Sequence, residues 1–241
     1  MVYKWLRKAW AQVFPGNCMI CGQVADTGMD LCFACRWHLP WLEYGCWRCA
    51  NPLVPTTRDR LLCGRCIHKP PQFDRSYCAF IYQQPVNWLL QGLKYQRRLT
   101  GIPVLSRLLL EFLHPRLEFQ PELIIPVPLH KSRLRMRGFN QALEIARPLA
   151  RAFNIPLSTQ ICTRIRETAP QSELPASRRS ANVRHAFRMQ APLTVKHVAI
   201  VDDIVTTGAT VNELARMLKR HGAESVQVWA VARTPINSRI K

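Results

Sequence analysis

The residues best suited to chemistry form one run near the C-terminus, where two carboxylates precede a turn of small and hydroxyl-bearing residues. Asp202 and Asp203 follow the apolar segment 198–201, and the predicted helix 209–221 begins just beyond the turn. A helix N-terminus offers free N–H groups and the positive end of the helix dipole, both of which favour a bound phosphate. Carboxylate oxygens accept hydrogen bonds from the hydroxyls of a sugar attached to that phosphate.

This run therefore predicts a 5-phosphoribosyl site. Gly208 lets the backbone approach a ligand closely, and the threonine hydroxyls add hydrogen-bond donors. Two adjacent aspartates can also form a turn and helix-cap pair, but that simpler role would not require the threonine-rich turn. The predicted phosphoribosyl-binding residues are Asp202, Asp203, Thr206, Thr207, Gly208, Ala209 and Thr210.

A second cluster is basic and follows the predicted strand 123–126, with four cations in the seven residues 131–137. Because the carboxyl ends of parallel strands meet at one edge of a sheet, we expect these cations to lie near Asp202. Residues 167–190 are polar and basic without clear periodicity, and within them Thr168–Gln171 with Leu174, Arg178, Arg179 and Asn182 are predicted to form a mobile flap. A merely solvated basic loop is the alternative for the cluster. The residues predicted to bind pyrophosphate or DNA phosphate are Lys131, Arg133, Arg137 and Arg178.

Eight of the ten cysteines form four Cys-x-x-Cys pairs within the first 66 residues. Each pair supplies two corners of a tetrahedral Zn²⁺ site, so four pairs predict two closed, structural zinc sites. A disulfide framework would need an oxidising compartment, and no export signal is visible. Consecutive pairing is favoured over nested pairing, which stays possible, because shorter loops cost less entropy. The predicted ligands are Cys18, Cys21, Cys32, Cys35, Cys46, Cys49, Cys63 and Cys66, while Cys78 and Cys162 are predicted to be buried and apolar.

The chain of 241 residues has a net charge of +19. Of its 34 cationic residues 26 are arginine, whose planar guanidinium binds phosphate through two hydrogen bonds. The charge is concentrated in residues 131–188, where 12 basic residues stand against 3 acidic ones. This distribution favours phosphate or nucleic acid as a partner, and a basic surface without a partner is the alternative. The hydrophobic content of 48% excludes a disordered basic tail.

No apolar run approaches the roughly 18 residues needed to span a bilayer, and no secretory signal is visible. We therefore expect a cytoplasmic protein without a transmembrane segment. Residues 5–14 carry apolar side chains at helical spacing with lysine and arginine nearby, which predicts a short amphipathic helix. We expect its apolar stripe to pack on its own chain, with contact to a membrane surface as the alternative.

Strands and helices are predicted to alternate after residue 72, which indicates a mostly parallel sheet with helices on both faces. The boundary divides the chain into residues 1–71, with the amphipathic helix and a double zinc ribbon, and residues 72–241. Pro148 is expected to kink or break its helix. The predicted strands are 76–82, 123–126, 160–165, 197–201 and 225–232, and the predicted helices are 86–95, 103–113, 139–153 and 209–221.

Segment 198–210 closely resembles the phosphoribosyl-pyrophosphate motif of type I phosphoribosyltransferases. The chain as a whole resembles the ComF/GntX family of phosphoribosyltransferase-like proteins. This resemblance implies an α/β fold, a type I phosphoribosyltransferase-like parallel sheet flanked by helices, with a small N-terminal double zinc-ribbon domain. The residues that carry it are the four Cys-x-x-Cys pairs, Leu93-Lys94-Tyr95, the Pro-Val-Pro-Leu loop 126–129 with Arg133, the run Arg137–Gln141, Thr168, Gln171 and segment 201–210.

The family also implies a role in the uptake or use of extracellular DNA, either in natural competence or with DNA as a nutrient. We expect a phosphoribosyl-pyrophosphate-like ligand, accompanied by Mg²⁺ if it binds, and single-stranded DNA as a partner. DNA-uptake or recombination proteins are further expected partners. Single strands need aromatic stacking surfaces, for which the candidates are Trp37, Trp41, Trp47 and Phe139. For the tryptophans, packing within the zinc ribbons is the favoured alternative.

Two alternative functions stay open. The first is an active phosphoribosyltransferase in nucleobase or nucleotide salvage, for which the sequence shows no nucleobase site and no assigned catalytic residue. The second is a regulator that senses the phosphoribosyl donor.

Overall fold

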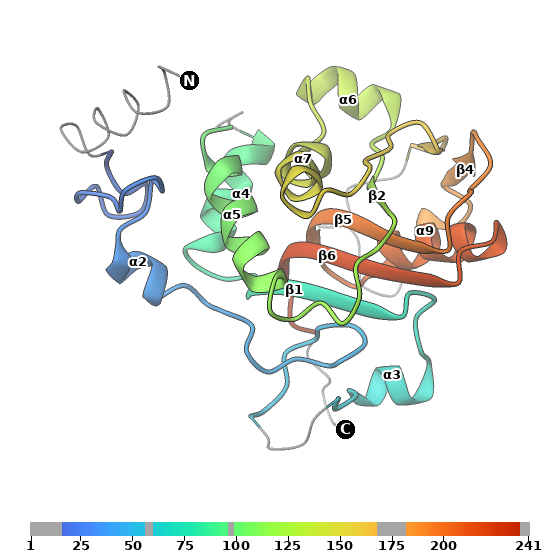
Figure 1. The fold of residues 1–241 in the computed structure, drawn as a ribbon, viewed down its shortest axis with the longest axis horizontal. Coiled ribbons are helices and arrows are strands. Elements are labelled where there is room, and N and C mark those ends of the chain that lie inside the picture. Colours follow the sequence, from blue (N-terminus) through green and yellow to red (C-terminus); the bar gives the residue numbers. More distant parts are fainter. Residues whose placement is uncertain (1–15, 56–59, 96–98, 168–181, 237–241) are drawn as a thin grey trace.

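A computed structural model describes residues 16–55, 60–95, 99–167 and 182–236 (Figure 1). The predicted N-terminal helix therefore lies outside the described residues, as do Thr168, Gln171 and Arg178 of the predicted flap. Within the part of the chain that is described, no helix is long and apolar enough to cross a membrane.

A four-stranded parallel sheet forms the centre of the molecule, with the strand order β1-β6-β5-β2 (Figure 1). The two central strands, β5 and β6, are buried along most of their length. Continuous apolar strands of this kind are typical of parallel sheets that are covered on both faces. The strands are β1 (Arg75–Ile81), β2 (Leu123–Pro126), β5 (His197–Val205) and β6 (Ser225–Arg233).

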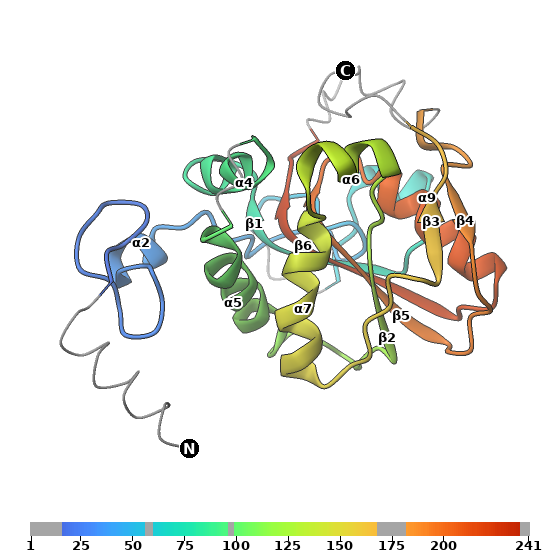
Figure 2. The ribbon, with the colours of Figure 1, turned by 90° about the horizontal axis from the view of Figure 1, so that it is seen from above.

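Helices cover both faces of this sheet, which confirms the predicted fold class (Figure 2). Three of them share one hydrophobic cluster on one face, namely α4 (Val86–Tyr95), α5 (Gly101–Leu113) and α7 (Gln141–Phe153). On the other face lies α9 (Ala209–Arg220), which buries an apolar stripe against the second cluster. Amphipathic helices with one buried stripe are the expected cover for such a sheet.

Two cysteine-containing ribbons precede the sheet, here named the first ribbon (residues 16–38) and the second ribbon (residues 42–68). The first ribbon contains α2 (Phe33–Trp37) and packs beside α5 (Figure 1). There Arg36 forms an ion pair with Glu111 at 2.8 Å. The first ribbon is therefore attached to the helical layer rather than to the strands.

The second ribbon contains α3 (Gly64–His68) and follows a segment that runs along the edge strand β1. The amide of Ile81 donates to the carbonyl of Pro40 at 2.8 Å, and the amide of Leu42 donates to the carbonyl of Ala79 at 2.9 Å. Buried residues from both sides of position 71 share the same hydrophobic clusters. The predicted domain boundary at that position stays a prediction.

The strand that carries the acidic pair is longer than predicted. The predicted strand 197–201 ends before Asp202, whereas β5 continues through both aspartates to Val205. In the register with β6, Asp202 lies opposite Ala230 and Val205 lies opposite Arg233. The β-branched residues that follow the aspartates favour an extended backbone, which explains the extension.

Pro148 does not break its helix, because α7 contains it as an interior residue. A proline inside a helix costs about 3 kcal/mol. The same helix fully buries Ile145, Ala146 and Leu149. Burial of one large aliphatic side chain alone stabilises by about 1.5–3 kcal/mol, so the packing outweighs the cost.

The basic cluster after β2 is a helix, α6 (Lys131–Arg137), and not the solvated loop considered as the alternative. The ring of His130 accepts from the amide of Ser132 at its start, and Gly138 ends it with φ of 83°. Positive φ favours glycine, which accounts for that residue. Asn140 then begins α7, because its side chain accepts from the amide of Ala142.

A short strand follows the residues of the predicted flap. β4 (Phe187–Met189) pairs antiparallel with β3 (Cys162–Arg164), and the two form a separate two-stranded sheet, here called the β3–β4 hairpin. β3 lies within the strand predicted at 160–165. β4 was missed because three residues are too few to show a periodic pattern.

We expect Asn140→Ala to lower the free energy of unfolding by about 1–2 kcal/mol, as is typical for the loss of a helix cap. The Asn140 amide also donates to the carbonyl of Val127 at 3.0 Å, so the substitution loosens the junction between β2 and α7. Urea denaturation followed by circular dichroism measures the change. Arg151→Ala, at an exposed position of the same helix, is the control, and equal stability of the two variants would contradict the assignment.

Candidate functional site

The turn between β5 and α9 carries most of the predicted phosphoribosyl residues. Gly208 stands at the start of α9 with φ of 78°, in the left-handed region that favours glycine. Thr207 accepts a hydrogen bond from the amide of Ala209 at 3.4 Å. The residues from Thr206 to Thr210 therefore form one turn at a helix N-terminus, which is a geometry that suits a phosphate.

The two aspartates occupy different environments. Asp203 is buried, with 8% of its surface exposed, while Asp202 is half-buried. Adjacent side chains on a strand point to opposite faces of the sheet, which accounts for the difference. Each carboxylate accepts a hydrogen bond from the backbone amide of the next residue. The amide of Asp203 donates to the Asp202 carboxylate at 2.9 Å, and the amide of Ile204 donates to the Asp203 carboxylate at 2.8 Å.

Arg164, which the sequence analysis missed, lies where three elements meet. Burial lowers the pKa of its guanidinium to about 10, the positive charge of Arg133 adds to this effect, and the carboxylate of Asp202 opposes it. These charges come from β3, α6 and β5, so the three side chains lie close enough to act on one another. Arg164 still carries its charge at neutral pH. The available signal was a single charged residue within the predicted strand 160–165.

The predicted cations of α6 do not all gather at one point. Arg133 belongs to the group around Asp202, whereas Lys131 is exposed and Arg137 donates to Gln141 at 3.2 Å. The hydroxyl of Ser132 donates to Glu167 at 2.5 Å, which ties the start of α6 to the chain after β3. Arg178, the fourth predicted phosphate ligand, lies outside the described residues.

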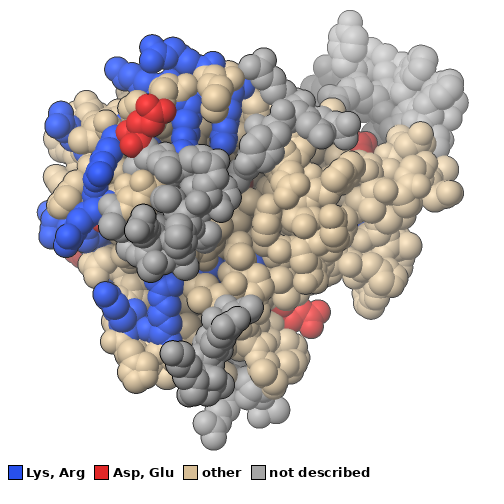
Figure 3. Space-filling model, turned by 180° about the vertical axis from the view of Figure 1, so that it is seen from behind, with Lys and Arg blue, Asp and Glu red and all other residues tan. Residues whose placement is uncertain are grey.

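Basic side chains gather on one side of the face seen in Figure 3. Figure 3 shows lysine and arginine gathered over the half that carries α6, β4 and α9, while the opposite half is mostly uncharged. The exposed cations on these elements and their neighbours are Lys131, Arg135, Arg166, Arg184, Arg188 and Arg220. We name these six residues the basic face. Its field attracts phosphate groups along a broad surface.

A groove of about 820 Å³ opens beside α6, between that helix, the start of α7 and the β3–β4 hairpin. We name it the α6–α7 groove. Lys131, Arg147 and Arg164 contribute charge to its lining, and Leu134 and Phe139 contribute apolar surface. Its volume falls within the range of about 300–1,000 Å³ that is usual for ligand sites.

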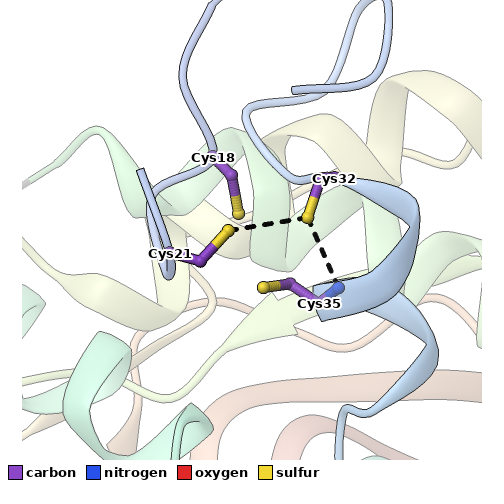
Figure 4. Close-up of side chains that lie close together, drawn as sticks. All are labelled: Cys18, Cys21, Cys32 and Cys35. Atoms are coloured by element: carbon purple, nitrogen blue, oxygen red, sulfur yellow. Dashed lines mark hydrogen bonds between the residues drawn. The ribbon is translucent and has the colours of Figure 1, made fainter. Parts of the chain in front are cut away.

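The eight predicted zinc ligands form two clusters, and the consecutive pairing is confirmed. Within each cluster the Sγ atoms all lie within 4.8 Å of one another. Figure 4 shows the first cluster, where the Sγ atoms of Cys21 and Cys32 are 3.7 Å apart and the amide of Cys35 donates to Cys32. Ligands at 2.3 Å around a tetrahedral zinc ion lie about 3.8 Å apart, so the sulfurs fit this metal. The first cluster is Cys18, Cys21, Cys32 and Cys35, and the second is Cys46, Cys49, Cys63 and Cys66.

The second cluster shows why a cation suits these sulfurs. A hydrogen bond from Cys49 lowers the pKa of Cys46 to about 4, and the same interaction, followed by burial, raises the pKa of Cys49. The crowded thiols therefore cannot all ionise without a positive charge among them. Zinc supplies that charge and is bound by thiolates, so the clusters support two structural zinc sites. Cys78 and Cys162 are buried outside the clusters, as predicted.

The four candidate stacking aromatics differ in environment. Trp41 packs on Phe80 with ring centres 4.5 Å apart, and Trp47 lies beneath the guanidinium of Arg75 at 5.0 Å. Trp37 is 71% exposed on α2, and Phe139 lines the α6–α7 groove. Two of the tryptophans thus pack between the ribbons and the sheet, as the alternative interpretation predicts.

Comparison with known proteins matches both ends of the chain to described families. Residues 140–238 match the phosphoribosyl transferase domain, and residues 9–67 match the double zinc ribbon domain. The DNA utilization protein YhgH of Escherichia coli O157:H7 is 40% identical over 224 residues, which cover 91% of each chain. Competence protein F of Haemophilus influenzae is 33% identical over 228 residues, which cover 91% of this chain and 98% of that protein.

More distant similarities cover less of the chain. Competence protein ComFC of Streptococcus pneumoniae is 26% identical over 155 residues, which cover 64% of this chain and 66% of that protein. Among solved structures, the purine phosphoribosyltransferase of Pyrococcus horikoshii aligns with 58% of this chain and 76% of its own, at 19% identity and a TM-score of 0.32.

We expect the purified protein to contain two zinc ions per chain, measured by plasma mass spectrometry. Cys32→Ser should lower that number to one and destabilise the first ribbon, because three thiolates hold a structural zinc ion poorly. Cys78→Ser is the matched control, since it removes a buried thiol outside both clusters. A zinc content of two in Cys32→Ser would contradict the assignment.

Proposed function

The chain belongs to the ComF/GntX family of phosphoribosyltransferase-like proteins, and from this premise we propose that it serves the uptake or use of extracellular DNA. Relatives that are similar along nearly their whole length carry the names DNA utilization protein and competence protein. In this proposal the chain binds two ligands, a phosphoribosyl-pyrophosphate-like molecule and single-stranded DNA.

One observation carries the small-molecule part of the proposal. At the carboxyl end of β5, a helix N-terminus with Gly208 follows Asp202, whose charge acts on Arg164 together with that of Arg133. The helix end suits the 5-phosphate, the carboxylate suits the ribose hydroxyls, and the two arginines suit pyrophosphate. These are the three parts of phosphoribosyl pyrophosphate. Mg²⁺, which commonly binds through phosphate oxygens and one or two carboxylates, would accompany that ligand.

We expect the double substitution Asp202→Asn with Asp203→Asn to raise the dissociation constant for phosphoribosyl pyrophosphate with Mg²⁺ at least tenfold. Hydrogen bonds to charged groups contribute about 1.5–3 kcal/mol each, and a tenfold change corresponds to about 1.4 kcal/mol. Isothermal titration calorimetry measures the affinity, and circular dichroism checks that the fold is intact.

The matched control, Glu43→Gln with Glu224→Gln, removes the same two negative charges at exposed positions away from β5's carboxyl end. It should bind like the unmodified protein. Unchanged affinity in the aspartate variant would refute the assigned role of the acidic pair, and the absence of binding to the unmodified protein would refute the ligand.

The DNA part of the proposal is supported by the basic face and the α6–α7 groove. Single-strand binding needs a cationic surface for phosphates together with apolar or aromatic surface for bases. The groove offers both kinds of side chain, for instance Lys131 and Phe139, and it lies beside α6, which carries Lys131 and Arg135 of the basic face. The abundance of arginine over lysine suits phosphate contacts.

We expect a labelled 20-nucleotide dT strand to bind the protein and to bind less tightly as salt rises. In Lys131→Ala with Arg135→Ala, the slope of log K against log salt should fall in magnitude by about 1.4, since each phosphate contact on a single strand contributes about 0.7. Fluorescence anisotropy at several salt concentrations gives the slope. The control, Arg107→Ala with Lys196→Ala, removes two exposed cations outside the basic face and should leave the salt slope unchanged. No binding at low salt would exclude DNA as a partner.

A further inference from the structure

The turn from Thr206 to Thr210 is named the phosphoribosyl turn here. Arg233 is a buried cation that connects the second ribbon with this turn. It is the last residue of β6 and is only 1% exposed. Its Nε donates to the carbonyl of Cys49 at 2.9 Å, and its Nη1 donates to the carbonyls of Val205 and Thr234 at 2.9 and 2.8 Å and to that of Thr206. One guanidinium therefore holds a zinc ligand's backbone and the end of β5 together.

Arg65 makes a second connection of the same kind. It lies between two ligands of the second cluster, Cys63 and Cys66, and donates to the carbonyl of Thr207 at 3.0 Å. Phe73, a few residues after the ribbon, lies within 4.0 Å of the position that a side chain at Gly208 would take. The second ribbon and its neighbours thus reach consecutive residues of the turn.

These contacts set the direction of the peptide groups in the turn. The carbonyl of one residue and the amide of the next point in opposite directions, because a trans peptide is planar. Arg65 of the second ribbon holds the carbonyl of Thr207, and Arg233 of β6, itself bonded to the ribbon at Cys49, holds those of Val205 and Thr206. The next amides, those of residues 206–208, therefore turn to the opposite side. Amides aligned on one side of a turn are what a bound phosphate requires.

The first ribbon has a different attachment among the described residues. Arg36 binds Glu111, and the carbonyl of Gly28 accepts from Arg107 at 2.9 Å, so both contacts are with α5. No contact that the described structure records joins it to residues 205–208. The two zinc centres thus have the same four-cysteine ligands but different neighbours. The first ribbon contacts α5, and the second ribbon contacts the phosphoribosyl turn and Arg233.

We infer that the second zinc centre, and not the first, sets the conformation of the phosphoribosyl turn and hence its affinity for a phosphorylated ligand. The inference rests on the proposed function for the identity of that ligand. Zinc binding and folding of a small ribbon are coupled, so loss of the metal releases the Cys49 carbonyl and the Arg65 side chain together. The turn then loses its bond to Arg65, and Arg233 loses the carbonyl that fixes its Nε. Coupling of this kind is reciprocal, so the ligand also retains the second zinc ion.

The test compares Cys63→Ser with Cys21→Ser in the full-length protein, each expected to contain one zinc ion by mass spectrometry. Hydrogen exchange of the amides in 205–210, measured without ligand, should accelerate at least tenfold in Cys63→Ser and stay within twofold of the unmodified protein in Cys21→Ser. The dissociation constant for phosphoribosyl pyrophosphate should rise at least tenfold in the first variant alone. Equal effects of both variants, or no effect of either, would overturn the inference.

A second pair of variants covers the case in which Cys63→Ser fails to fold. Arg65→Ala keeps all eight ligands and should weaken ligand binding several-fold at a zinc content of two, whereas Arg36→Ala, its counterpart in the first ribbon, should not. Equal affinities of these two variants would count against the inference. If the unmodified protein binds no phosphoribosyl pyrophosphate, the proposed ligand is refuted, and the exchange measurement alone decides whether the turn depends on the second zinc centre.

Discussion

A buried guanidinium must have its donors satisfied, and in this chain the Arg233 side chain meets that requirement only because several distant segments converge on it. It binds carbonyls from the second ribbon, from the end of β5 and from its own strand's end. Removing any of these partners would leave a charge in the interior. Arg233 therefore couples three features of the fold, so that none can change without the others. They are the position of the second ribbon, the end of the sheet and the shape of the phosphoribosyl turn.

Much of this arrangement could be predicted from local pattern. The spacing of the cysteines gave the two clusters, and the alternation of apolar strands with amphipathic helices gave the parallel sheet. The turn around Gly208 was recognisable because its residue types are dictated by backbone conformation and by phosphate chemistry. Whether the acidic pair and the turn hold a ligand is a question of affinity, which pattern alone does not answer.

The features that escaped prediction depend on contacts between distant parts of the sequence. Arg164 and Arg233 are the last residues of β3 and β6, and only the folded chain shows that each meets charges or carbonyls from other elements. Pro148 is tolerated because tertiary packing outweighs a local preference. The three-residue strand β4 exists because β3 offers it a partner, which no periodicity in its own sequence records.

The segment from Pro40 to Leu42 has a consequence for the solubility of the chain. It covers the outer edge of β1 with antiparallel hydrogen bonds, and an uncovered edge strand is a template for pairing with another molecule. The segment lies between the two ribbons, so both metal centres hold its ends in place. A chain short of metal would expose a long apolar edge, and self-association would then compete with folding during synthesis.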